Sequence, residues 1–242
     1  MLFNDDVLFL HVPKTGGMSV TSFLINNLPG RIHISVPRPA FEHTAGLSAF
    51  PDVNERLTLI PGIRHEDLRQ TQKILGKHGR RLSDFQLLVS TIRNPYDLEV
   101  SYYFHLRKEA ARKNGTNLRP ALELAISGDF EAFVRNAPYY GHLPSRIERY
   151  YLIDGAMPPN MRTMRFENLE QELGIFAPFS LNRWELPHRN RTSGRPPWPD
   201  VVNQKCEHEI HQKYGFLFEF YPRHLESTAC ARALSSQDTL IT

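Results

Sequence analysis

An apolar run that leads through a short basic loop into a helix is the feature that most constrains the fold. Residues 7–12 (VLFLHV) form a short continuous run, which predicts a strand buried on both faces. The chain then passes through Pro13-Lys14-Thr15-Gly16-Gly17 into residues 19–28, which predict a helix. Strand, short loop and helix are the repeating unit of parallel α/β sheets.

The same alternation continues along the chain. Further strands are predicted at residues 31–36, 57–60, 85–92 and 161–166. Helices are predicted at residues 66–76, 96–108, 120–127, 129–136, 144–153, 167–174 and 200–214. We therefore expect an α/β fold, with one domain over residues 1–225, a central mostly parallel sheet and flanking helices. Residues 37–56 are expected to form a loop or lid, and residues 226–242 a flexible C-terminal tail.

The composition argues against several classes of protein. With 40% hydrophobic and 23% charged residues among 242, the chain is of ordinary globular type. Its net charge of +3 suits an anionic ligand but not a nucleic-acid partner, which calls for a denser basic stripe. Cys206 and Cys230 lack metal-ligand spacing, which favours a reducing compartment and no metal site. Since no apolar stretch approaches the ~20 residues of a membrane span, we expect a cytoplasmic protein.

The loop between the first strand and helix has the chemistry of an anion site. Its glycines allow a close approach of the backbone, the helix start offers N–H groups, and Lys14 adds a full charge. Thr15 and Ser19 add hydroxyl groups. Because Lys14 precedes both glycines, the loop differs from the ATP-binding GxxxxGK[ST] loop. A plain Gly-Gly turn is the alternative, but it leaves Lys14 and the hydroxyl groups unexplained.

A second anion site is predicted where residues 85–92 lead into Arg93-Asn94-Pro95. Asn94 and Pro95 suit the cap and first residue of a helix. Arg93 stands at the carboxyl end of the predicted strand, where open α/β sheets bind ligands, and arginine suits bidentate contact with phosphate. Ser101, about two turns into the helix, could add a hydroxyl group. The alternative is a capped helix start with a structural pair between Arg93 and Asp97.

HVPKTGGMS resembles the 5′-phosphosulfate loop of sulfotransferases that use 3′-phosphoadenosine-5′-phosphosulfate (PAPS), especially the carbohydrate (heparan sulfate 2-O-type) branch. RNPYDLEVS resembles the 3′-phosphate motif of that family, and weaker similarities follow at residues 164–169 and 186–191. The resemblance implies a P-loop-like sulfotransferase fold. It also implies that PAPS donates a sulfuryl group to an acceptor hydroxyl and leaves as 3′-phosphoadenosine-5′-phosphate (PAP), without a metal.

Carried over to this sequence, the resemblance assigns three groups of residues. Those at the 5′-phosphosulfate are Lys14, Thr15, Gly16, Gly17, Met18 and Ser19, with Lys14 stabilising the donor. Arg93 and Ser101 are assigned to the 3′-phosphate, and Asn190, Arg191 and Thr192 to a late loop that closes over the nucleotide. Two positions depart from the family pattern. Met18 stands where Thr or Ser is usual, and Leu98 where Arg often follows the motif's Asp.

The resemblance also implies a histidine base between the two loops, and His65 is the leading candidate. A histidine can accept a proton at neutral pH. His11, His33 and His43 are rivals, and His11 could instead support the loop. Glu66 and Asp67 could serve as the base or orient His65.

Two other functions stay open at this point. A nucleotide kinase or phosphotransferase would require magnesium and would normally carry the Walker lysine after its glycines. A non-catalytic member of the fold would bind a nucleotide or a glycan without turnover. The acceptor, a sugar or a small molecule with a hydroxyl group, is not specified by any motif.

Overall fold

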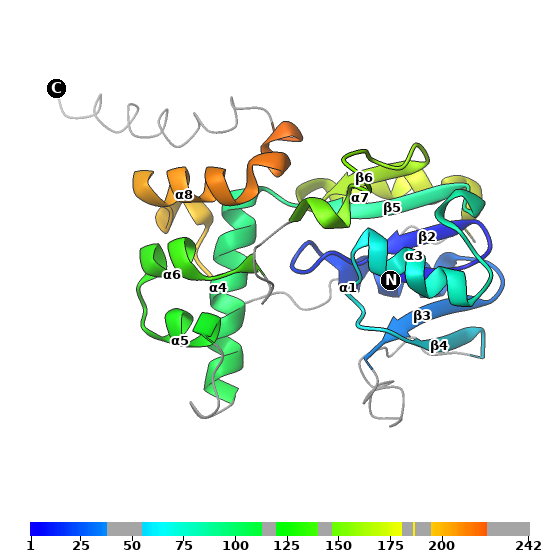
Figure 1. Ribbon diagram of the computed structural model, residues 1–242, viewed down its shortest axis with the longest axis horizontal. Coiled ribbons are helices and arrows are strands. Elements are labelled where there is room, and N and C mark those ends of the chain that lie inside the picture. The colour runs from blue at the N-terminus through cyan, green and yellow to red at the C-terminus, as the bar shows by residue number, and fades with distance from the viewer. Residues whose placement is uncertain (38–54, 113–119, 140–146, 181–185, 187–194, 222–242) are drawn as a thin grey trace, which may run out of the picture. The chain divides into compact units, whose positions relative to one another are not determined.

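The computed structural model describes residues 1–37, 55–112, 120–139, 147–180, 186 and 195–221 (Figure 1). The chain divides into two compact units. Residues 1–93 and 147–191 belong to the first, named here the sheet unit, and residues 94–146 and 192–242 to the second, named here the helical unit. Most of the predicted loop at 37–56 and the whole predicted tail at 226–242 lie outside the described residues. The prediction of one domain over residues 1–225 stays a prediction.

Among the described residues, six strands form one sheet in the order β4-β3-β1-β2-β5-β6. Their bounds are Leu2–Phe3 (β1), Val7–Leu10 (β2), Ile32–Val36 (β3), Leu57–Pro61 (β4), Leu87–Ile92 (β5) and Met161–Arg165 (β6). β1 is antiparallel to both of its neighbours, whereas the other pairs are parallel. All strands except β1 therefore point the same way within a mixed sheet, and the predicted α/β class is confirmed.

The short strand β1 was not predicted. Its cause is a tight turn at Asn4, whose side-chain Oδ1 accepts hydrogen bonds from the backbone N–H groups of Asp6 (3.1 Å) and Val7 (2.8 Å). Asparagine commonly makes such turns with its own side chain. The turn folds Leu2 back onto Phe9 and inserts β1 between β2 and β3. A two-residue strand is too short to show any hydrophobic period.

One face of the sheet carries the main hydrophobic core. Side chains alternate between the two faces of a strand, and one set of them packs against the helix α1 (Gly17–Asn27) and the segment from α7 (Leu169–Glu172) through η6 (Leu173–Phe179). Fully buried members of this core include Leu2, Val7, Phe9, Val20, Phe23, Leu24, Ile34, Val89, Leu173 and Phe176. Ser35, next to Ile34, therefore faces the opposite side, where it contacts Glu66 just before α3 (Leu68–Lys77).

The remaining helices of the sheet unit are short 3-10 turns. They are η2 (Leu82–Asp84), η4 (Ile147–Tyr150) and η5 (Phe166–Asn168). The helix predicted at residues 144–153 is wrong over its described part beyond η4. There the chain reverses at Asp154 and Gly155, both with positive φ, and Ile153 bridges to Ala156. Positive φ at both positions is incompatible with a continuing helix.

The helical unit is built around α4 (Pro95–Arg112), the longest helix described. The other helices are α5 (Pro120–Ile126), α6 (Phe130–Asn136), η7 (Trp198–Asp200), α8 (Gln204–Tyr214) and η8 (Gly215–Glu219). The predicted start of α4 is confirmed, because Oδ1 of Asn94 accepts a hydrogen bond from the N–H group of Tyr96 (3.0 Å). The helix predicted at 200–214 begins later, because Asn203 caps α8 by accepting from Cys206 N–H (2.9 Å).

A buried ion pair holds α8 to α4 within the helical unit. The ammonium of Lys213 lies 2.6 Å from Oε1 of Glu99, and the Tyr214 hydroxyl donates to the other carboxylate oxygen. Glu99 is fully buried and Lys213 nearly so. A carboxylate in such a place is tolerated because its partners replace the lost water.

Replacing Lys213 should therefore destabilise the protein strongly. In Lys213→Ala the charge of Glu99 stays buried without its ammonium partner, and we expect a loss of about 3–5 kcal/mol. Lys205→Ala is a matched control, because Lys205 is exposed and forms a loose pair with Glu131 at 3.9 Å. Such surface pairs contribute ~0–1 kcal/mol, so this variant should keep nearly the stability of the wild type. Urea unfolding measures both; equal stabilities of the two variants would contradict the expected role of the pair.

Candidate functional site

Six of the predicted site residues lie at one edge of the sheet. Parallel strands end at a common edge, so the segments that follow β2, β4, β5 and β6 all start there. These segments contain the loop from Pro13 to Gly16, the turn at Gly62–Glu66, Arg93 and Phe166. The fold thus places Lys14 to Gly17, His65 and Arg93 at the same edge of one unit, with β2 and β5 adjacent and β4 separated from β2 by β3 and β1.

The loop from Pro13 to Gly16 has a fixed and unusual backbone. Lys14 (φ 64°) and Gly16 (φ 83°) both adopt left-handed conformations, which cost about 1–2 kcal/mol for a residue with a side chain. Helix α1 begins at Gly17, two residues before its predicted start, and Ser19 donates its N–H to the Gly16 carbonyl (3.0 Å). The N–H groups of Gly17 and Met18, which precede this bond in α1, are therefore close to Lys14 in the chain.

Each glycine of this loop makes room for a neighbouring side chain. A Cβ on Gly16 would lie 2.8 Å from both Phe166 and Leu169, and a Cβ on Gly17 would overlap the His11 ring. The sequence suggested that these glycines allow an anion to approach. The structure adds a different reason, which is close packing against residues of the protein itself.

Thr15 fastens the loop to β5. Its hydroxyl donates to the Val12 carbonyl (2.9 Å) and lies 2.5 Å from the hydroxyl of Thr91. Since the one hydroxyl proton of Thr15 goes to Val12, Thr91 donates to Thr15. The Thr15 side chain is buried and engaged within the loop, so at an anion site Thr15 can contribute only its backbone.

Arg93 supports the same loop from the end of β5. Its guanidinium donates to the Lys14 carbonyl (2.7 Å), and its Cζ lies 4.0 Å from the centre of the Phe166 ring. Arg93 is buried. Phe166 was not singled out as a site residue; its position at the end of the strand predicted at 161–166 was the available signal.

His65 packs against His11 beside this loop. The His65 Nδ1 lies 2.9 Å from the His11 carbonyl oxygen, and the two rings meet edge to face with centroids 4.6 Å apart. Because a carbonyl oxygen only accepts, Nδ1 carries the proton and Nε2 carries the lone pair. Burial, outweighing the hydrogen bond to His11, lowers the pKa of His65 to about 4, and burial lowers the pKa of His11 well below its ordinary value. Both rings are therefore neutral near pH 7.

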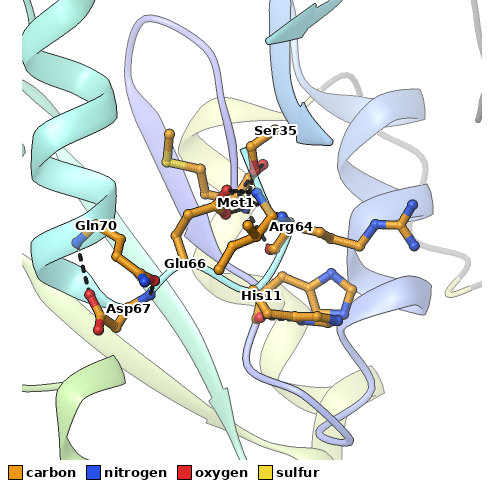
Figure 2. A network of polar contacts seen from close by, with 9 residues as sticks. Met1, His11, Ser35, Arg64, Glu66, Asp67 and Gln70 are labelled. Carbon is orange, nitrogen blue, oxygen red and sulfur yellow. Dashed lines mark hydrogen bonds and ion pairs between the residues drawn. The ribbon is translucent and has the colours of Figure 1, made fainter. Parts of the chain in front are cut away.

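The two carboxylates next to His65 have structural partners. Glu66 contacts Met1, Ser35 and the backbone of the turn before it (Figure 2). Burial raises the pKa of Glu66, but the Met1 ammonium and the hydrogen bonds from Met1, Ile63 and Ser35 outweigh it and hold the pKa at about 2. Asp67 caps α3 by accepting the Gln70 N–H (2.8 Å). Both side chains already serve local structure, which favours a histidine over either of them as a base.

Arg64 is a cation of this edge that sequence reasoning missed. Its backbone is left-handed (φ 73°), and its guanidinium lies 3.9 Å from the Met18 sulfur in the first turn of α1. Met18 thus contacts a basic residue where the sulfotransferase family usually has a hydroxyl group. The only sequence signal was the place of Arg64 beside His65.

The other predicted residues lie within helices, in the sheet or outside the described residues. Ser19 is buried in α1, and Ser101 is buried in α4 of the helical unit. The pairing of Ser101 with Arg93 at one phosphate stays a prediction. Asn190, Arg191 and Thr192, as well as His43, lie outside the described residues. His33 stacks on Phe3 at 4.8 Å, within the sheet.

Among the described residues, no group of three or more His, Cys, Asp or Glu residues could hold a metal ion. Within the same residues, no helix has the length and apolar character needed to cross a membrane. Comparison of the chain with protein-family models, curated proteins and solved structures finds no match.

The packing of Gly17 predicts a large effect of one methyl group. Gly17→Ala places a Cβ inside the His11 ring, so the loop or the ring must move, and we expect a loss of about 1–3 kcal/mol. Gly76→Ala, in α3 with nothing near its Cβ, should instead stabilise by about 0.5–1 kcal/mol. Chemical unfolding of both variants measures the difference; two variants of similar stability would contradict this reading of the loop.

The lowered pKa of His65 predicts how stability depends on pH. Between about 4 and its ordinary value of 6.5, the unfolded imidazole binds a proton and the folded one does not, so protons favour unfolding. The contribution is complete above pH 6.5 and is lost as the pH falls toward 4, by up to about 3 kcal/mol. Urea unfolding across this range should show a steeper loss for the wild type than for His65→Asn, which keeps a donor for His11 without titrating. Parallel curves would contradict the buried, neutral His65.

Proposed function

We propose that this protein is a PAPS-dependent sulfotransferase and that its sheet unit has a P-loop-like sulfotransferase fold. The observation that carries the proposal is that residues in and just after β5 hold the loop from Pro13 to Gly16, named here the lysine loop. Arg93 donates to the Lys14 carbonyl, and Thr91 donates to Thr15, so the loop after β2 is fixed to the adjacent parallel strand. A preorganised cationic loop at a helix N-terminus suits an anionic donor.

The residues present fit a phosphosulfate group. Lys14 supplies a charge, and the backbone of the loop and the first turn of α1 supply N–H groups. Arg93 has five N–H donors in its guanidinium, so its bond to Lys14 is compatible with a further contact to phosphate. Arg93 and Ser101 would hold the 3′-phosphate. PAPS supplies an activated sulfuryl group with PAP as the leaving group; Lys14 would stabilise the charge that develops when that group leaves.

His65 is the proposed base. At neutral pH its Nε2 carries a lone pair that can accept the proton of an acceptor hydroxyl. Although its pKa of about 4 is low for a base, negative charge near an imidazole raises its pKa. A bound phosphosulfate would therefore shift His65 toward the range in which general base catalysis is effective. The acceptor is a sugar or another molecule with a hydroxyl group.

Sulfate transfer from labelled PAPS tests this function directly. The protein is incubated with a panel of carbohydrates and phenols in the presence of EDTA, and transfer is expected without added metal. Lys14→Ala should lower turnover by at least about 100-fold, as the removal of a preorganised donor does in other enzymes. Lys73→Ala, an exposed lysine on α3, should leave it unchanged. Wild-type turnover in Lys14→Ala would overturn the proposed mechanism.

Calorimetry of nucleotide binding separates the alternatives. PAP should bind without metal and more tightly than ATP with magnesium; the reverse order would indicate a kinase. PAP binding without transfer to any acceptor would favour a non-catalytic binding protein. In the same assays His65→Ala should lose turnover and keep PAP binding, whereas lost binding would make His65 a structural residue.

A further inference from the structure

The turn that carries His65 is held in a strained shape. Gly62 donates its N–H to the Val36 carbonyl (2.8 Å) at the end of the adjacent strand, and Arg64 is left-handed at φ 73°. Such a conformation persists at a residue with a side chain only when the surroundings enforce it. His65 follows directly, so the direction of its side chain depends on this strained residue.

The carboxylate of Glu66 enforces that shape. Its Oε1 accepts the backbone N–H groups of Ile63 (2.6 Å) and Arg64 (3.2 Å). Its Oε2 accepts from the Ser35 hydroxyl (2.8 Å) and the Met1 ammonium (2.7 Å), as Figure 2 shows. One oxygen therefore holds the turn, and the other ties it to β3 and to the start of the chain. Glu66 is 1% exposed, so these bonds are shielded from water.

Two further contacts fit this arrangement. A Cβ on Gly62 would overlap Oε1 of Glu66, so a side chain at position 62 would push the carboxylate away from the turn. The Arg64 carbonyl also accepts from the Met1 ammonium (2.8 Å), which fixes the peptide bond just before His65. The backbone on the N-terminal side of His65 is thus held from both its N–H and its carbonyl groups.

We propose that Glu66 is a positioning residue that fixes the turn at Gly62–Glu66 and thereby holds His65 with Nδ1 on the His11 carbonyl and Nε2 as the proton acceptor. The proposal rests on the proposed function where it concerns turnover. Its structural part, the tautomer of His65, is independent of that function. Glu66 acts through His65 and need not touch a substrate.

Nitrogen NMR of the histidine rings in the 242-residue chain tests the structural part. The wild type should show His65 with its proton on Nδ1. In Glu66→Ala the turn amides lose their acceptor, so a mixture of the two tautomers is expected. Glu66→Gln keeps an oxygen for those amides and should restore the Nδ1 tautomer in part. Asp67→Asn is the matched control: it removes a neighbouring carboxylate while asparagine still caps α3, and the His65 signals should not change.

Sulfate transfer then tests the catalytic part. In Glu66→Ala we expect kcat to fall on the order of 10- to 100-fold, as small misplacements of reacting groups do, with the KM for PAPS changed by less than about 3-fold. If Glu66→Ala does not fold, Gly62→Ala replaces it, because its Cβ displaces Oε1 from the turn. An unchanged His65 tautomer in the folded variant would overturn the proposal. If the wild type transfers no sulfate, the proposed function fails, and the NMR result still decides whether Glu66 orients His65.

Discussion

The common direction of β2, β4, β5 and β6 is the constraint on which the rest of the candidate site depends. Because these strands all point in the same direction, the segments that follow them begin at one edge of the sheet. Residues that are far apart in sequence, such as Lys14, His65 and Arg93, therefore reach the same edge of the sheet without any long excursion of the chain. The antiparallel strand β1 does not change this arrangement, because β2 and β3 on either side of it point in the same direction.

At this edge, backbone groups are held largely by buried side chains. Arg93 and Thr15 fix the loop after β2, and Glu66 fixes the turn after β4. Two non-glycine residues, Lys14 and Arg64, adopt left-handed conformations within those two segments. Strained backbone that is over-determined by its surroundings is common at functional sites. The combination separates this edge from an ordinary set of strand-to-helix connections.

Much of the fold could be predicted from the sequence, because its signals are local. The buried strands show as continuous apolar runs, and Asn94-Pro95 marks the start of α4 by the chemistry of a helix cap. The short strand β1 could not be found in this way. The region at 144–153 was also misread, because its apolar pattern gave no sign of the reversal at Asp154 and Gly155.

The site could be predicted only in part, for a related reason. Residue types and spacing pointed to Lys14 and Arg93, and the family resemblance to His65, but none of these signals showed what each residue contacts. Glu66 lies 31 residues from Ser35 and 65 from Met1, and no local pattern encodes such contacts. The sequence singled out Gly16 and Gly17, although Gly17 already belongs to α1. Their close neighbours, Phe166 and His11, follow only from the packed sheet.

The pairing of β2 with β5 has a consequence for how the molecule folds. The β1–β2 hairpin and α1 are made from contacts close in sequence, which form quickly. The bond from Arg93 to Lys14, by contrast, joins residues 79 positions apart, and closing so long a segment costs chain entropy before any contact rewards it. The lysine loop thus acquires its shape only after β5 has docked beside β2. The strand and the helix on either side of the loop can therefore form from local contacts without giving the loop its final shape.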